Sequence, residues 1–197
     1  AEQMYAPNNS DDNLINDGDR ILIIGGMGNV GLSIAQGLSA VKNVEFILTS
    51  TRNLAVGNSS ISIEKEKYIS EIEKNSSSVH IKKCDVNGDM SAFMDSLISE
   101  FGKINHIIFS AGIIGDNTFA LIKDTTKEIC DIQFDVKIKG LENVANIIKN
   151  YDVDNFIVIS SVSSILGGIG HAAYSVSNMV IDFFVRKQNK TGNINWL

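Results

Sequence analysis

The stretch ILIIGGMGNVG, residues 21–31, decides the fold of this chain. Four aliphatic residues, 21–24, are stopped by glycines, and an amphipathic segment with apolar residues at Val30, Ile34 and Leu38 follows. This order predicts a strand, a turn that approaches a phosphate group, and a helix whose N-terminal N–H groups face the same ligand. We take the following as the candidate cofactor loop: Gly25, Gly26, Met27, Gly28, Asn29, Val30 and Gly31.

The rest of the chain repeats this alternation of aliphatic runs and amphipathic segments. We expect further strands at the aliphatic runs 44–48, 79–81, 104–109, 156–159 and 194–197. Apolar residues at helical spacing predict helices over 90–101 and 138–148, and a run of charges over 61–75 indicates a solvated helical face. Continuous aliphatic runs are typical of strands covered on both faces. The pattern therefore predicts one α/β domain, residues 20–197, with a Rossmann-like doubly wound parallel sheet flanked by helices.

Composition excludes several classes of protein. The 197 residues carry 17 Lys and Arg against 23 Asp and Glu, a net charge of −6, so we expect no nucleic-acid partner. Cys84 and Cys130 form no metal-binding pattern, which predicts no metal site and fits the cytoplasm. The polar residues 1–19 are expected to be a linker or arm, and no signal peptide or membrane span is recognised.

The end of the second expected strand distinguishes between the two nicotinamide dinucleotides. Sites for NAD usually hold a carboxylate there, which accepts a hydrogen bond from the ribose 2′-hydroxyl. This chain instead offers Ser50, Thr51 and Arg52. Because a guanidinium pairs well with a 2′-phosphate, we expect NADPH as the cofactor. A solvent-facing arginine after a strand is the alternative.

Several further motifs together resemble the short-chain dehydrogenase/reductase superfamily, and most of all the ketoreductase domains of polyketide synthases. They are IIGGMGNVG (23–31), CDV (84–86), SAG (110–112), SSVSSILGGIGHAAYSVSN (160–178) and INW (194–196). The resemblance covers nearly all of the chain from residue 20 onward. Ordinary members of the superfamily have Lys four residues after the catalytic tyrosine, whereas assembly-line ketoreductases resemble this chain in having Asn there and a Lys on an earlier helix.

The resemblance implies a set of site residues. Further cofactor contacts are implied at Asp85, Val86, Ser110, Ala111 and Gly112. The implied catalytic residues are Tyr174, Ser161, Lys137 and Asn178. Lys139 is an alternative to Lys137, and a solvent-facing turn residue is the alternative reading of Asp85. The serines at 160, 163 and 164 are set aside because only Ser161 has the family's separation from Tyr174.

Side-chain chemistry explains why such a set reduces a ketone. The alkoxide that forms on hydride addition needs a proton, and a phenol with a pKa near 10 exchanges protons reluctantly at neutral pH. An ammonium group at Lys137 would favour the phenolate of Tyr174, while Ser161 would hydrogen-bond the substrate carbonyl. Asn178 would hold this relay or its water in place. We expect no part for His80, His106 or His171, which are read as structural or surface residues.

The implied function is the NADPH-dependent reduction of a β-ketoacyl thioester on an acyl carrier protein, within a multidomain polyketide synthase. Two alternatives stay open: a free-standing dehydrogenase for a small alcohol, and a nucleotide-binding module without catalysis. The family pattern also continues past residue 197 into a substrate-covering lid and a last strand, so the domain is expected to be incomplete here. Asp116, in a segment partly similar to Leu-Asp-Asp, and Leu166 in place of Trp favour a D-configured hydroxyl product.

Overall fold

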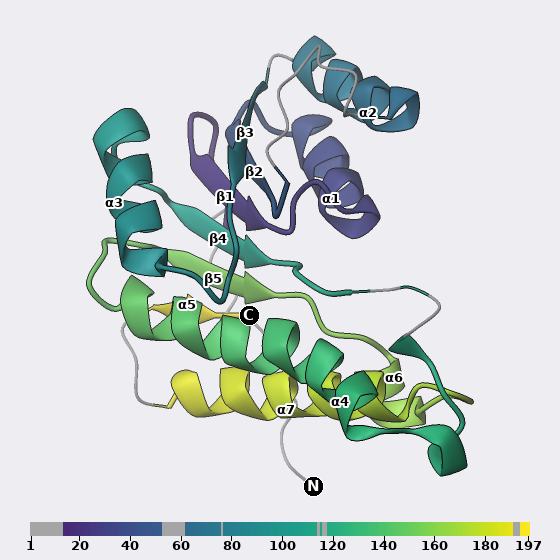
Figure 1. Cartoon of the computed structure of the whole chain (residues 1–197). Coiled ribbons are helices and arrows are strands. Elements are labelled where there is room, and N and C mark those ends of the chain that lie inside the picture. Colours follow the sequence, from purple (N-terminus) through teal and green to yellow (C-terminus); the bar gives the residue numbers. More distant parts are fainter. Residues whose placement is uncertain (1–13, 53–61, 76, 114, 116–117, 191–193) are drawn as a thin grey trace, which may run out of the picture.

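The computed structural model describes residues 14–52, 62–75, 77–113, 115, 118–190 and 194–197. Within these residues a parallel sheet has the strand order β3-β2-β1-β4-β5-β6, which confirms the predicted doubly wound Rossmann-like topology (Figure 1). The strands are β1 (Arg20–Ile24), β2 (Glu45–Ser50), β3 (Ser78–Lys83), β4 (His106–Phe109), β5 (Asn155–Val158) and β6 (Asn195–Trp196). The order reverses direction between β1 and β4, and at such a switch point α/β proteins bind ligands beyond the carboxyl ends of the strands.

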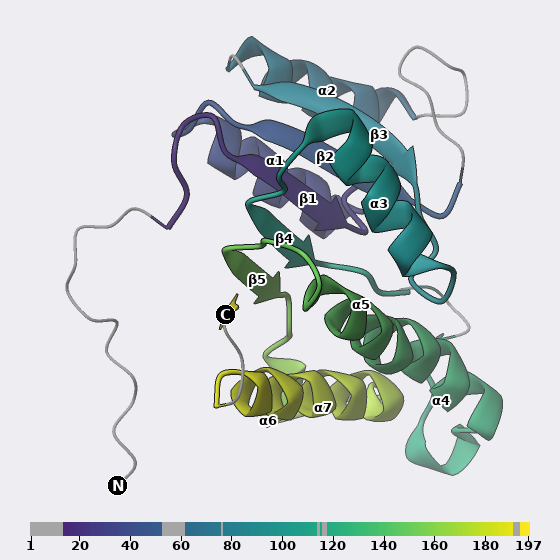
Figure 2. The same ribbon diagram turned by 90° about the vertical axis from the view of Figure 1, so that its left-hand side faces the viewer.

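Helices cover the two faces of the sheet. The helices are α1 (Asn29–Ser39), α2 (Ile63–Lys74), α3 (Met90–Phe101), α4 (Lys127–Phe134), α5 (Gly140–Ile148), α6 (Ser163–Leu166) and α7 (Ala172–Gln188). Two short turns are η2 (Ile122–Asp124), a 3-10 turn, and η3 (Asp135–Lys139), a π-helical turn. Figure 1 and Figure 2 show α1 and α2 against β1–β3, with α3 on the opposite side of these strands.

Alternate residues of β1 enter two separate hydrophobic cores. Leu22 and Ile24 join the core beneath α3, α5 and α7, whereas Ile21 and Ile23 join the core beneath α1 and α2. All four side chains are buried, because β1 is a central strand with helices on both sides. This is the packing that an unbroken aliphatic run requires.

A chain of polar side chains ties the amino ends of four strand segments together. Asn155 Nδ2 lies 3.0 Å from His106 Nδ1, which assigns the ring proton to Nε2, and Nε2 donates to Asp19 Oδ2 at 2.8 Å. Asn195 Nδ2 donates to Asn155 Oδ1 at 2.7 Å. His106 is 2% exposed, so this network satisfies polar groups that would be costly if left unpaired.

The first nineteen residues are partly described. Residues 1–13 of the expected linker lie outside the described part of the chain. Ile15, by contrast, is 8% exposed and packs in the core beneath α1 and α2, and Asp19 belongs to the polar network above. These two residues of the predicted linker therefore belong to the folded unit.

Most expected elements are found with shifted ends, but one region differs in kind. The helix predicted over 138–148 is the last part of a longer arrangement, in which α4 leads through η3 into α5. In η3 the Gly140 N–H donates to the Asp135 carbonyl, five residues back. A π-helical turn departs from the 3.6-residue period, so a periodicity search finds only the regular helix beyond it.

Candidate functional site

The glycines after β1 allow the loop, the sheet and α1 to pack closely. Gly25 has a φ of +80°, and a Cβ there would lie 2.8 Å from the Ala111 Cα. At Gly26 a Cβ would lie 2.7 Å from the Ile23 carbonyl oxygen, and at Gly31 it would lie 2.6 Å from the Gly26 Cα. No side chain fits at such distances, so these three glycines serve helix–strand packing as well as any approach of a ligand.

Two neighbours of the loop hold its backbone in place. The Thr49 Oγ1 at the end of β2 accepts a hydrogen bond from Gly25 N at 2.9 Å, and Met27 N donates to the Thr49 carbonyl at 3.1 Å. Lys65, in the first turns of α2, donates from Nζ to the Met27 carbonyl at 2.7 Å. A cation therefore stands against the glycine loop, at the edge where the ends of β1 and β2 meet.

The start of α1 fits a phosphate group. Gly28 is the residue that precedes the helix, so no side-chain cap occupies the first N–H groups, and residues 28–30 are exposed. The first N–H groups of a helix have no partner within the helix, and the helix dipole adds partial positive charge at this end. With Lys65 close by, the loop can hold the pyrophosphate of a dinucleotide, as the sequence predicts.

The predicted cofactor residues after β2 and β3 lie at the same carboxyl edge. Ser50 Oγ accepts a hydrogen bond from Arg52 N at 3.1 Å, and both Thr51 and Arg52 are exposed. Asp85 is exposed and its carboxylate accepts from Asn87 N at 3.0 Å, which is a turn contact. Val86 is buried against Gly140, where a Cβ would lie 2.4 Å from the valine Cγ2.

The SAG segment after β4 links the cofactor loop to the expected catalytic residues. Ser110 donates from both its backbone N and its Oγ to the Ile24 carbonyl, at 2.9 and 3.0 Å. Ala111 faces Gly25, and Gly112 faces Lys137, since a Cβ on Gly112 would lie 3.3 Å from the lysine Cε. The segment therefore touches the predicted nucleotide loop at one end and the predicted catalytic lysine at the other.

Three of the four expected catalytic residues come together. Lys137, in η3, donates from Nζ to the Asn178 Oδ1 at 3.0 Å, and the same Nζ lies 5.5 Å from the centroid of the Tyr174 ring. Asn178 donates from Nδ2 to the Tyr174 carbonyl at 2.8 Å. Tyr174 and Asn178 stand one turn apart on α7, which packs against α4 and η3. An ammonium group thus reaches a phenol from a different helix.

Burial changes the acidity of this lysine. Lys137 is 6% exposed, and desolvation lowers the pKa of its ammonium to about 8, although the Asp182 carboxylate on α7 opposes the shift. Lys139 differs in every respect: it is exposed, it pairs with Asp135 at 2.5 Å, and that hydrogen bond raises its pKa. The structure therefore places Lys137, and not Lys139, beside the tyrosine.

The fourth expected catalytic residue follows β5. Ser161 Oγ accepts hydrogen bonds from the Ser163 backbone N at 3.2 Å and from the Ser163 hydroxyl at 2.9 Å. Its own hydroxyl hydrogen is left to donate. His171 stacks on Phe119 with ring centroids 4.5 Å apart and stands edge-on to Tyr174 at 5.9 Å, so it lines the surroundings of the tyrosine.

Sequence reasoning missed three residues of this region. Thr49 and Lys65 hold the glycine loop, and Gln133 on α4 is fully buried and donates to the Ile113 carbonyl at 2.9 Å. Lys65 lies in the charge run that was interpreted as a solvated face, and nothing in its spacing distinguishes it from its neighbours. Asp116, named for product configuration, lies outside the described residues.

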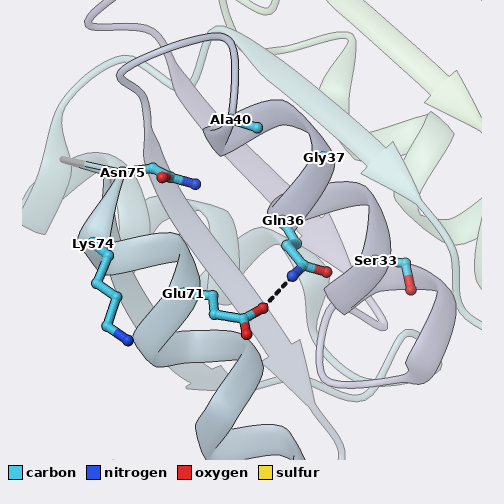
Figure 3. A pocket seen from close by; sticks show the side chains of 7 residues that line it. All are labelled: Ser33, Gln36, Gly37, Ala40, Glu71, Lys74 and Asn75. Carbon is cyan, nitrogen blue, oxygen red and sulfur yellow. Dashed lines mark hydrogen bonds between the residues drawn. The ribbon is translucent and has the colours of Figure 1, made fainter.

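Other features of the described residues do not belong to the site. A pocket between α1 and α2, where Gln36 donates to Glu71, is lined by residues between 33 and 40 and between 71 and 75, and none of the predicted site residues lines it (Figure 3). In the described ranges, no three His, Cys, Asp or Glu side chains are grouped so that they could hold a metal ion. No helix in the same ranges is long and apolar enough to cross a membrane.

The fold, together with the family match over residues 20–195, defines the class of protein: a member of the short-chain dehydrogenase/reductase superfamily. The sequence profile of the KR domain matches residues 20–195, so the chain belongs to the KR domain family, the ketoreductase domains of polyketide synthases. This confirms the resemblance stated from the motifs.

Individual relatives agree with this assignment. Polyketide synthase PksN of Bacillus subtilis (strain 168) is 29% identical over 176 residues, which are 88% of this chain and 3% of that synthase. A ketoreductase domain from the bacillaene assembly line superposes with a TM-score of 0.77 at 26% identity, over 89% of this chain and 40% of that one. An N-terminal ketoreductase from the macrolactin assembly line shares the fold, with a TM-score of 0.79 at 24% identity, over 92% of this chain and 36% of that one. The chain thus spans less than half of the length of each of these proteins.

Proposed function

We propose that this chain reduces a β-ketoacyl thioester, carried by an acyl carrier protein, to the β-hydroxyacyl product, with NADPH as the reductant. The observation that carries the proposal is the contact of Lys137 with Asn178 and with the ring of Tyr174. A buried ammonium beside a phenol has a clear use in proton transfer to a ketone oxygen. A buried ammonium with no function would only destabilise the fold, because burial penalises the charge.

The residues of the site divide the reaction between them. When bound, NADPH supplies the hydride that adds to the carbonyl carbon. The Tyr174 hydroxyl gives its proton to the carbonyl oxygen, and the Ser161 hydroxyl, whose hydrogen is not used within the protein contacts described above, donates a hydrogen bond to the same oxygen. Lys137 stabilises the phenolate that remains. Asn178 holds the lysine by accepting its hydrogen bond.

Several features support the choice of cofactor. Arg52 at the end of β2 and Lys65 against the glycine loop supply two cations near the place of a dinucleotide's phosphates. The carboxylate that usually binds an NAD ribose is missing from residues 50–52. Positive charge in this position favours the additional 2′-phosphate of NADPH.

The setting follows from the family. Its relatives are named as polyketide synthases, and this chain matches 3% of the length of one of them, so we propose that residues 20–197 work beside further domains of such a synthase. The predicted location is the cytoplasm. A free-standing dehydrogenase and a module without catalysis are the outcomes against which the proposal is tested.

The decisive experiment replaces the proton donor. Tyr174→Phe removes one hydroxyl, and we expect it to lower the oxidation of NADPH that depends on a β-ketoacyl thioester by at least about a thousandfold. NADPH binding, measured by its fluorescence, should stay within about twofold, because the phenol ring remains. Tyr151→Phe is the matched control, since its hydroxyl bonds Asp95 on the surface at 2.6 Å.

Three outcomes separate the candidate functions. Turnover that requires the carrier-bound substrate supports the proposal, and equal turnover of free small ketones supports a free-standing dehydrogenase. Binding of NADPH without any ketone-dependent oxidation by the unaltered protein supports a module without catalysis. Undiminished turnover in Tyr174→Phe would overturn the assigned chemistry.

A further inference from the structure

Gln133 is a buried polar side chain that the reaction described above does not use. It is 0% exposed, and it is the buried residue of α4. Its Nε2 donates to the Ile113 carbonyl at 2.9 Å, whereas its Oε1 is buried without a hydrogen-bond partner in the described part of the chain. An apolar side chain of similar size would fill this place without burying an unpaired side-chain acceptor, and it would leave only the carbonyl of Ile113, an exposed residue, without its donor. The buried amide of Gln133 is therefore less favourable for stability than an apolar side chain would be. A role other than packing would explain why it is there.

The bond from Gln133 holds Ile113, the residue that directly follows the SAG segment. Ser110, at the other end, is fixed by its two hydrogen bonds to the Ile24 carbonyl. Gly112 lies between these two attachments and directly precedes Ile113. The segment is thus held at both ends, once by β1 and once by α4.

The same segment forms a wall for the catalytic lysine. A Cβ on Gly112 would lie 3.3 Å from the Lys137 Cε and 3.9 Å from its Nζ, so the glycine backbone packs on the end of the lysine side chain. Gln133 and Lys137 stand four residues apart on one continuous helical segment. Lys137 packs on Gly112, and Gln133 bonds the next residue, Ile113. On its other side Lys137 meets Asn178 and Tyr174.

We propose that Gln133 is a positioning residue for Lys137: by holding Ile113 it keeps Gly112 against the lysine side chain, and thereby keeps the ammonium on Asn178 and beside Tyr174. The inference rests on the proposed function for what the lysine does. It adds the residue that determines where the lysine stands.

The test follows the lysine itself as well as turnover. Gln133→Met keeps the length of the side chain and removes the donor, so the wall loosens and water reaches Lys137. We expect the apparent pKa of Lys137, measured on the intact protein by competitive amine labelling and mass spectrometry, to rise by about one pH unit toward its ordinary value. The rate kcat should fall by about tenfold, with less than a twofold change in the KM for the ketone.

Matched variants separate positioning from a loss of packing. Gln36→Met removes an amide of α1 that bonds Glu71 in the pocket of Figure 3, far from the site, and should change neither quantity. Gly112→Ala acts on the wall directly, and because Gly112 is exposed this variant remains informative if Gln133→Met does not fold. The titratable groups around Lys137, which are Tyr174 and Asp182 on α7 and Asp135 and Lys139 on its own turn, are the same in every variant.

The outcomes are distinct. A shift of the Lys137 pKa in both Gln133→Met and Gly112→Ala, with less than additive effects in the double variant, supports the proposal. An unchanged Lys137 pKa in Gln133→Met, or in Gly112→Ala if only that protein folds, overturns it. Labelling needs no turnover, so an unaltered protein that fails to reduce ketones would contradict the proposed function and leave this test intact.

Discussion

Replacing Lys137 by Met should make the protein more stable at neutral pH while it destroys the proposed activity. The pKa of this ammonium falls from 10.5 in the unfolded chain to about 8 in the folded one, because burial penalises the charge. A group whose folded pKa lies below its unfolded pKa destabilises the fold whenever it is charged. The penalty is complete below about pH 8 and disappears as the pH rises toward 10.5.

The magnitude follows from the two pKa values. Each unit corresponds to about 1.4 kcal/mol, so the buried charge costs about 3 kcal/mol at pH 7 and about 1 kcal/mol at pH 9.5. Met removes this penalty but leaves the Asn178 Oδ1 without its donor, which costs about 1 kcal/mol. We therefore expect Lys137→Met to raise the free energy of unfolding by about 2 kcal/mol at pH 7, and to have almost no effect at pH 9.5.

Urea denaturation of the two proteins at both pH values measures this difference. Lys139→Met is the matched control: this lysine is exposed and paired with Asp135, and its pKa is raised, so its loss brings no gain at pH 7. A Lys137→Met protein that is less stable than the unaltered one at pH 7, with a difference that persists at pH 9.5, would refute the reasoning.

Three further predictions concern the pH range of the reaction, two glycines of the loop and of α1, and the contact of Arg52 with the cofactor. Reduction should slow above about pH 8, where Lys137 loses its proton; a rate that stays constant to pH 10 would contradict the role of the ammonium. Gly26→Ala should lower the free energy of unfolding by about 3 kcal/mol in urea denaturation, since its Cβ would lie 2.7 Å from the Ile23 carbonyl oxygen, whereas Gly37→Ala, with nothing within 4 Å, should stabilise α1 by about 1 kcal/mol. Arg52→Ala should weaken NADPH binding about tenfold and NADH binding hardly at all in fluorescence titrations; equal losses would exclude a contact with the 2′-phosphate.

The fold could be predicted from the sequence because its strands differ sharply in composition from what surrounds them. The run 21–24 is aliphatic throughout, since β1 is buried on both faces, and the glycines after it mark the end of the strand. The expected strand 104–109 begins at His106 instead, although Ile104 is fully buried, because burial alone does not require strand pairing. Apolar pattern predicts which residues are inside and leaves the ends of the elements open.

The site was less accessible to the same reasoning. The set Lys137, Tyr174 and Asn178 was implied by a family resemblance, and periodicity alone gives no reason to bring residues 137 and 178 together. The π-helical turn that carries Lys137 has no signal in the spacing of apolar residues. Buried polar residues such as Gln133 are recognised only when their partners are seen, because a glutamine on a helix is ordinarily exposed.

The polar chain through Asp19, His106, Asn155 and Asn195 has a consequence for how such a domain tolerates change. It holds the strands together at their amino ends, opposite to the glycine loop and Lys137, so alignment of the strands does not depend on the loops at their carboxyl ends. Exchange of the loops at the carboxyl ends of the strands should therefore preserve the sheet. Substitutions of Asp19, His106, Asn155 or Asn195 should instead weaken the whole sheet. A design that aims at a new ligand specificity would therefore vary the loops at the carboxyl ends of the strands and keep the four residues of the polar network.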